Sequence, residues 1–177
     1  QLSHMRACYV LDLPGFGESN EPTEPWGIDD YADAIEAFIS MLPDDHIDVL
    51  VHSFGGRIML KLLPREKGKQ IIQKVLITGG AGMKPKRSWK FYVKKYTAKT
   101  LKAPFIILPQ PLRDKALNWL RKTELWKSLG SSDYSKLSGA MRETFVKSVT
   151  ENLEDSLPHI SHDTLLLWGR NDDATPV

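Results

Sequence analysis

The feature that most constrains this chain is a short apolar run that ends in a serine and two glycines. Residues 49–58 read VLVHSFGGRI. The first three residues are typical of a buried strand, and the apolar stretch after the glycines is compatible with a helix. Glycine at positions 55 and 56 would let that helix approach the strand closely, because side chains there would block the contact. The sequence therefore predicts a strand, a tight turn and a helix, with Ser53 at the tip of the turn.

This pattern resembles the nucleophile elbow of the α/β-hydrolase family, which has the form small-x-Ser-x-small. Gly55 fits the second small position, whereas Val51 occupies the first, where glycine or alanine is more usual. The resemblance implies that Ser53 is a nucleophile and that the Phe54 backbone N–H donates to an oxyanion. The alternative is a buried strand followed by a glycine-rich turn, in which Ser53 only caps the helix.

Two further segments are similar to turns of the same family. Residues 7–11 (ACYVL) are predicted to form a buried strand, which leads into the turn DLPGFGES. Residues 164–168 (TLLLW) are predicted to form another buried strand, followed by GRNDD. The first turn resembles the family's Asp-x-Pro-Gly-x-Gly-x-Ser turn, and the second resembles the turn that carries the acid of the catalytic triad. By this resemblance Asp172 is the acid, with Asp173 as the alternative.

The triad histidine follows the acid in this fold, and the printed sequence has no histidine after Asp172. The family's first strands and the loop with its second oxyanion donor would precede residue 7. We therefore expect the 177 residues to be an internal part of a longer hydrolase. The alternative is a natural short protein that has lost catalysis.

Hydrophobic periodicity predicts the fold class. We expect a helix over 30–42, a strand over 47–51, a helix over 54–63 and a strand over 74–78. Asp29 is a plausible N-cap of the first helix, and Pro43 would end it. This alternation predicts an α/β fold with a mostly parallel, doubly wound sheet and crossover helices. The resemblance implies a partial α/β-hydrolase fold with an inserted helical cap.

The charge distribution suggests where the cap begins. Residues 84–127 contain 13 basic and 2 acidic residues, whereas the segments on both sides are acidic on balance. We therefore expect a hydrolase core over 1–83, a helical cap over 84–157, and a return to the core over 158–177. Helices are predicted over 88–96, 112–125 and 138–149, with chain breaks at 102–104 and 108–111 and a turn at 130–134. The first helix would turn one apolar face inward: Trp89, Tyr92, Val93 and Tyr96.

The basic residues of the cap raise the possibility of nucleic-acid binding, but a solvated helix face explains them without a recognition motif. We expect no nucleic-acid partner. We also expect no cofactor and no metal site, because the spacing of His159 and His162 completes no set of zinc ligands. No apolar run approaches the length of a transmembrane span. Cys8 is expected to be a small buried side chain, which favours a reducing, cytoplasmic location.

The resemblance implies the chemistry of acyl transfer to water. Ser53 would attack a carbonyl carbon, a histidine would accept the serine proton, and Asp172 would orient that histidine. The expected substrate is a small molecule with an ester or related acyl group. The alternative is a protein that binds a small ligand on a hydrolase scaffold without turning it over, because a fold does not determine a function.

Overall fold

The computed structural model describes residues 4–84, 89–107, 109–123, 137, 139–172 and 175. The chain divides into two compact units. The first unit contains the chain up to Lys84 and from Gly139 onward, and the second spans 85–138. The helix α8 (Gly139–Thr150), which we had expected in the cap, thus belongs to the first unit. The assignment of 84–157 to a cap stays a prediction.

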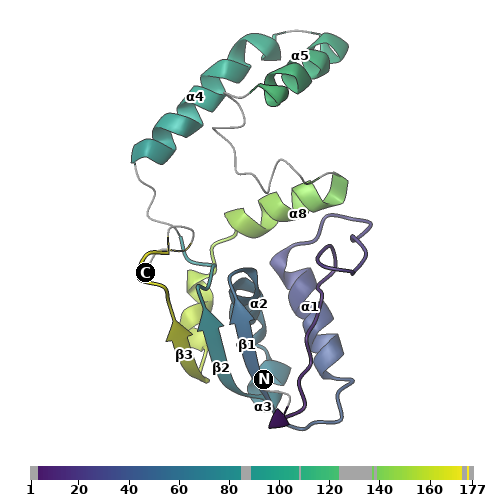
Figure 1. The fold of residues 1–177 in the computed structure, drawn as a ribbon, viewed down its shortest axis with the longest axis vertical. Coiled ribbons are helices and arrows are strands. Elements are labelled where there is room, and N and C mark those ends of the chain that lie inside the picture. Colours follow the sequence, from purple (N-terminus) through teal and green to yellow (C-terminus); the bar gives the residue numbers. More distant parts are fainter. Residues whose placement is uncertain are drawn as a thin grey trace. The chain divides into compact units, whose positions relative to one another are not determined.

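The first unit contains a parallel sheet of three strands in the order β1-β2-β3 (Figure 1). The strands are β1 (Ile47–His52), β2 (Ile72–Thr78) and β3 (Asp163–Leu167). In the register of the sheet, His52 lies beside Thr78, and Thr78 lies beside Leu167. The carboxyl ends of all three strands therefore meet at one edge. This confirms the predicted α/β fold with parallel strands and crossover helices.

Helices α1 (Ile28–Ile39), α2 (Phe54–Leu62) and α3 (Glu66–Ile71) belong to the same unit. Helix α2 packs against β1, and α1 packs against α2. In β1 the half-buried Val49 and Val51 alternate with exposed residues, so one face of the strand contacts the helices. Large, fully buried side chains of the core come from α1, α2 and β2: Tyr31, Ile58, Leu62, Ile72 and Val75.

The N-terminal cap of α1 differs from the prediction. The cap residue is Gly27, whose backbone N–H donates to Asp30 Oδ2 at 2.7 Å. Our assignment of Asp29 as the N-cap was wrong because the Asp29 carboxylate instead accepts hydrogen bonds from Lys61 and Arg65. The helix ends at Ile39, before Pro43.

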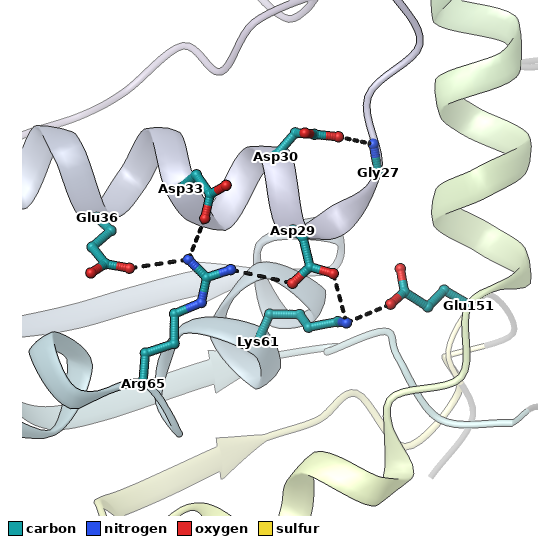
Figure 2. A network of polar contacts seen from close by, with 8 residues as sticks. All are labelled: Gly27, Asp29, Asp30, Asp33, Glu36, Lys61, Arg65 and Glu151. Atoms are coloured by element: carbon teal, nitrogen blue, oxygen red, sulfur yellow. Dashed lines mark hydrogen bonds and ion pairs between the residues drawn. The ribbon is translucent and has the colours of Figure 1, made fainter.

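A network of ion pairs joins α1 to α2 and to the chain after α8 (Figure 2). The Lys61 ammonium lies 2.9 Å from Asp29 Oδ2 and 2.7 Å from Glu151 Oε1. Arg65, just after α2, contacts three carboxylates along one side of α1: Asp29, Asp33 and Glu36. The hydrogen bond from Lys61 holds the pKa of Asp29 below its usual value.

Residues 7–11 do not form the predicted buried strand. They have no regular secondary structure, and Val10 is 93% exposed. Cys8 is exposed as well, which corrects our expectation of a buried thiol. A strand exists only where a neighbour accepts and donates its backbone hydrogen bonds, and in the described part of the chain residues 7–11 join no sheet. Side-chain contacts hold this segment instead, including a hydrogen bond from the Tyr9 hydroxyl to Asp44.

The strand predicted over 164–168 exists as β3, but it is not buried. All five of its residues are exposed, because β3 lies at the edge of the sheet and, in the part of the chain that the structure describes, pairs with β2 alone. The chain between the second unit and β3 contains α8 and a short 3-10 helix, Glu154–His159. The helix predicted over 138–149 is confirmed to within a residue at each end.

The second unit contains α4 (Trp89–Ile106) and α5 (Gln110–Lys122), which pack against each other. The predicted break at 102–104 was wrong: Pro104 lies inside α4, in the last turn before the helix ends. Pro111 lies in the first turn of α5, where proline costs no helical hydrogen bond. Along the predicted inward face of α4, Trp89, Val93 and Tyr96 are exposed. The Tyr92 side chain and the turn at 130–134 lie outside the described residues.

None of the helices in the described ranges has both the length and the apolar character that a bilayer crossing would require.

Candidate active site

Ser53 has an unusual backbone conformation. Its φ is 46° and its ψ is −104°, and no other non-glycine residue in the described part of the chain has a positive φ. Such conformations cost about 1–3 kcal/mol and persist only where the surrounding structure imposes them. The strain falls at the one residue that connects β1 to α2, where the sequence predicted the tip of a tight turn.

Three backbone hydrogen bonds hold this turn. The Ser53 N–H donates to the Thr78 carbonyl at 3.1 Å. The Ser53 carbonyl accepts from the Gly56 N–H at 3.0 Å and from the Ala81 N–H at 3.1 Å. The turn is therefore fixed to the end of β2 and to the loop that follows it, rather than by its own residues alone.

The two glycines of the turn allow close packing, as predicted. A Cβ atom at Gly55 would lie 3.0 Å from the Val51 Cβ, and one at Gly56 would lie 3.1 Å from the Gly80 Cα. Both distances are too short for comfortable contact. Val51, the unusual residue in the first small position, fills the space next to Gly55, so glycine at 55 accommodates the larger strand residue.

Phe54 is the first residue of α2, so its backbone N–H has no partner four residues earlier in the helix. The N-terminus of a helix also carries partial positive charge, which favours an anion nearby. A negative oxygen formed beside Ser53 would meet this N–H. The geometry thus agrees with the predicted role of Phe54, which stays a prediction.

Asp172 follows β3 and is held in place through its carboxylate. The Thr175 N–H donates to Asp172 Oδ1 at 2.8 Å, and the Thr175 hydroxyl lies 3.0 Å from Oδ2. The Asp172 N–H donates to the Gly169 carbonyl at 3.2 Å. These bonds fix the orientation of the carboxylate. Asp173, the alternative acid, lies outside the described residues.

The end of β2 brings Asp172 and the serine turn to the same edge of the sheet. Thr78 accepts the Ser53 N–H, and the next residue, Gly79, borders the carboxylate. A Cβ at Gly79 would lie 3.1 Å from Asp172 Oδ2 and 3.3 Å from His52 Cε1. Gly79 also has a φ of 50°. The sequence gave no indication that Gly79 borders both the Asp172 carboxylate and the His52 ring.

His52 does not act on Ser53 in this structure. Its Nδ1 lies 2.9 Å from the Thr78 carbonyl oxygen and 3.0 Å from the Thr78 hydroxyl. These contacts hold the His52 ring against the end of β2. His162 Nε2 lies 3.1 Å from the Gly68 carbonyl oxygen, and His159 lies in the 3-10 helix. Within the described ranges, no three acidic, histidine or cysteine side chains form a group that could hold a metal ion.

Four aromatic rings surround the beginning of α2, and the sequence gave no sign of their contact. The Tyr31 ring lies with its centroid 5.1 Å from that of Phe54 and 5.0 Å from that of Trp26. The Phe16 ring stacks on Phe54 at 5.4 Å. The Tyr31 hydroxyl donates to the Pro14 carbonyl at 2.9 Å, and burial raises the pKa of Tyr31 to about 12. Tyr31 therefore stays protonated and connects α1 to the turn at 12–19.

The family comparison agrees with this geometry. A family model described as the alpha/beta hydrolase fold matches residues 1–177. The chain belongs to the alpha/beta hydrolase family. The parallel strands and the helices that connect them are thus part of an α/β-hydrolase fold.

Known relatives are similar over most of this α/β-hydrolase chain. The AB hydrolase superfamily protein YisY of Bacillus subtilis is 28% identical over 178 residues, which cover 94% of this chain and 64% of YisY. A membrane phospholipase A, a bacterial virulence factor, has a TM-score of 0.61 at 21% identity over 93% of this chain and 54% of its own. A meta-cleavage product hydrolase from Pseudomonas fluorescens has a TM-score of 0.54 at 17% identity, and the match covers 93% of this chain and 62% of the hydrolase. This chain therefore spans less than two thirds of each of these relatives.

Proposed function

We propose that the full-length protein is a serine hydrolase that transfers the acyl group of an ester or related substrate to water. Ser53 attacks the carbonyl carbon, and the Phe54 N–H donates to the oxyanion that forms. A histidine, which by the family's order follows Asp172 in the full-length protein, accepts the serine proton. Asp172 orients that histidine and stabilises its charged form.

The strained backbone of Ser53 is the observation that carries this proposal. A serine that only capped α2 would have an extended backbone, and its hydroxyl oxygen would accept a hydrogen bond from a backbone N–H in the first turn of the helix. Ser53 instead has a φ of 46°, and no side-chain capping bond is formed. Strain of this kind is typical of functional residues, because folding alone would favour relaxing it.

The proposed substrates include esters and related acyl compounds, without a preference for one acyl group. The two similar solved structures are named for a phospholipase and for a meta-cleavage product hydrolase. These names refer to different substrates, so the family supports hydrolysis without selecting one acyl group. We propose that residues 84–157 form a cap that selects among acyl chains.

A covalent probe tests the nucleophile. Incubation of the full-length protein with a fluorophosphonate should label it, and Ser53→Ala should abolish the label. Ser40→Ala is the matched control, because Ser40 lies at the end of α1 and its hydroxyl donates to the Glu36 carbonyl at 2.7 Å. Its label should equal that of the wild type. Equal labelling of Ser53→Ala and wild type would refute the proposal, as would a wild-type protein that is never labelled.

A further inference from the structure

The Phe54 side chain is held between two rings that come from distant parts of the sequence. Phe16 stacks on it with an interplanar angle of 30° and a centroid distance of 5.4 Å. Tyr31 meets it edge-on at 5.1 Å and 89°. Tyr31 is fully buried, whereas Phe16 is 43% exposed. Tyr31 is therefore part of the core, and the position of Phe16 needs a different explanation.

The turn that carries Phe16 is fixed without its ring. The Gly15 N–H donates to the Asn20 carbonyl at 2.9 Å, and the Glu18 N–H donates to Asp12 Oδ2 at 3.0 Å. The Tyr31 hydroxyl binds the Pro14 carbonyl within the same turn. These polar contacts set the path of the backbone, so the turn presents Phe16 to Phe54 as a preformed surface.

The stacked Phe54 follows the strained serine directly in the chain. The peptide bond between Ser53 and Phe54 carries the N–H that would donate to the oxyanion. A strained Ser53 can relax through a change in its own ψ, which would turn this N–H and move the Phe54 ring with it. An aromatic pair contributes a free energy of the same order as such backbone strain, so the ring contact can oppose the rotation.

We propose that Phe16 is a positioning residue, which fixes the Phe54 ring and thereby the direction of the Phe54 N–H. This inference rests on the proposed function, because an aligned N–H matters only if an oxyanion forms at Ser53. The Phe54 N–H donates a hydrogen bond to an oxygen that becomes negative only in the transition state. A misaligned N–H should therefore lower kcat and leave KM nearly unchanged.

The test compares three variants of the full-length protein with p-nitrophenyl butyrate as substrate. Loss of one oxyanion donor lowers kcat about 100- to 1,000-fold, so misalignment of one should cost roughly tenfold. Phe16→Leu should therefore lower kcat about tenfold, with KM within about twofold. Phe16→Tyr keeps the ring and should restore the wild-type kcat. Tyr9→Leu is the matched control, because Tyr9 also packs an exposed ring on α1, 6.1 Å from Phe38, whereas the described ring contacts of Phe54 are with Phe16 and Tyr31.

A transition-state analogue separates alignment from loss of stability. Binding of butylboronic acid to Phe16→Leu should weaken by the same factor as kcat, while binding to Tyr9→Leu should not change. An unchanged kcat in Phe16→Leu would overturn the inference and leave the proposed function intact if Ser53→Ala is inactive. A KM effect without a kcat effect would overturn it too. A wild-type protein without Ser53-dependent hydrolysis would remove the proposed function and this inference together.

Discussion

Gly79 offers the sharpest test of how the fold supports the candidate acid. It follows β2 with a φ of 50°, a conformation that costs an alanine roughly 1–2 kcal/mol. An alanine Cβ would also lie 3.1 Å from Asp172 Oδ2 and 3.3 Å from His52 Cε1. Gly79→Ala should therefore destabilise the protein by backbone strain and also press against the carboxylate.

The two effects can be separated with a second glycine. Gly139 has a φ of 51°, and among the described residues, its chain neighbours and its own helix backbone aside, a Cβ there would have no atom within 4 Å. Gly139→Ala should cost only the backbone strain, about 1–2 kcal/mol. At Gly79 the tight contacts should add about 1 kcal/mol, at the lower end of the cost of overpacking, because the carboxylate can shift by a few tenths of an ångström.

Guanidinium denaturation of both full-length variants measures these free energies of unfolding, and hydrolysis at saturating substrate measures the effect on the site. We expect Gly79→Ala to be less stable than Gly139→Ala by about 1 kcal/mol. We also expect only Gly79→Ala to lose activity, roughly tenfold, because its Cβ displaces Asp172. Equal stability and equal activity of the two variants would refute the reasoning that Gly79 provides space for the carboxylate.

Two further predictions concern the contacts between α2 and its neighbours. Arg57 is buried, and its Nη1 donates a hydrogen bond to the Glu151 carbonyl at 2.8 Å. Arg57→Met should therefore lower the free energy of unfolding by about 1–3 kcal/mol. An unchanged denaturation midpoint would contradict this prediction. The pKa of Asp29 is lowered because Lys61 donates a hydrogen bond to its charged carboxylate. The ionised carboxylate therefore stabilises the folded protein fully at a pH above its ordinary pKa of 3.8, and this contribution is lost as the pH falls through the folded-state pKa. The stability difference between wild type and Asp29→Asn should therefore shrink below pH 3.8, and a difference that is constant from pH 7 to pH 3 would exclude this role.

The local pattern around Ser53 was sufficient to predict β1, the turn and α2. The alternation of β1, the two glycines and the apolar face of α2 all act between residues close in sequence. The positive φ of Gly15 and Gly17 in the early turn was predictable for the same reason, because glycine permits it wherever it stands.

Two of the errors concern elements whose form depends on distant partners. Residues 7–11 have the composition of a strand, but they have no neighbouring strand in the described part of the chain. The cap of α1 was misassigned because Lys61 and Arg65, more than 30 residues away, bind the carboxylate of Asp29. Neither effect leaves a signal in the local sequence.

The sequence by itself determined the strand, the tight turn at Ser53 and the helix that follows, because these depend on local periodicity and glycine geometry. Only the tertiary structure decided the strain at Ser53, the position of Gly79 against Asp172, and the contact of Phe16 with Phe54. Each of these arises where the ends of parallel strands and a separate turn converge. Residues that meet in this way are far apart along the chain, and their packing is set by the whole sheet and its helices rather than by any one segment.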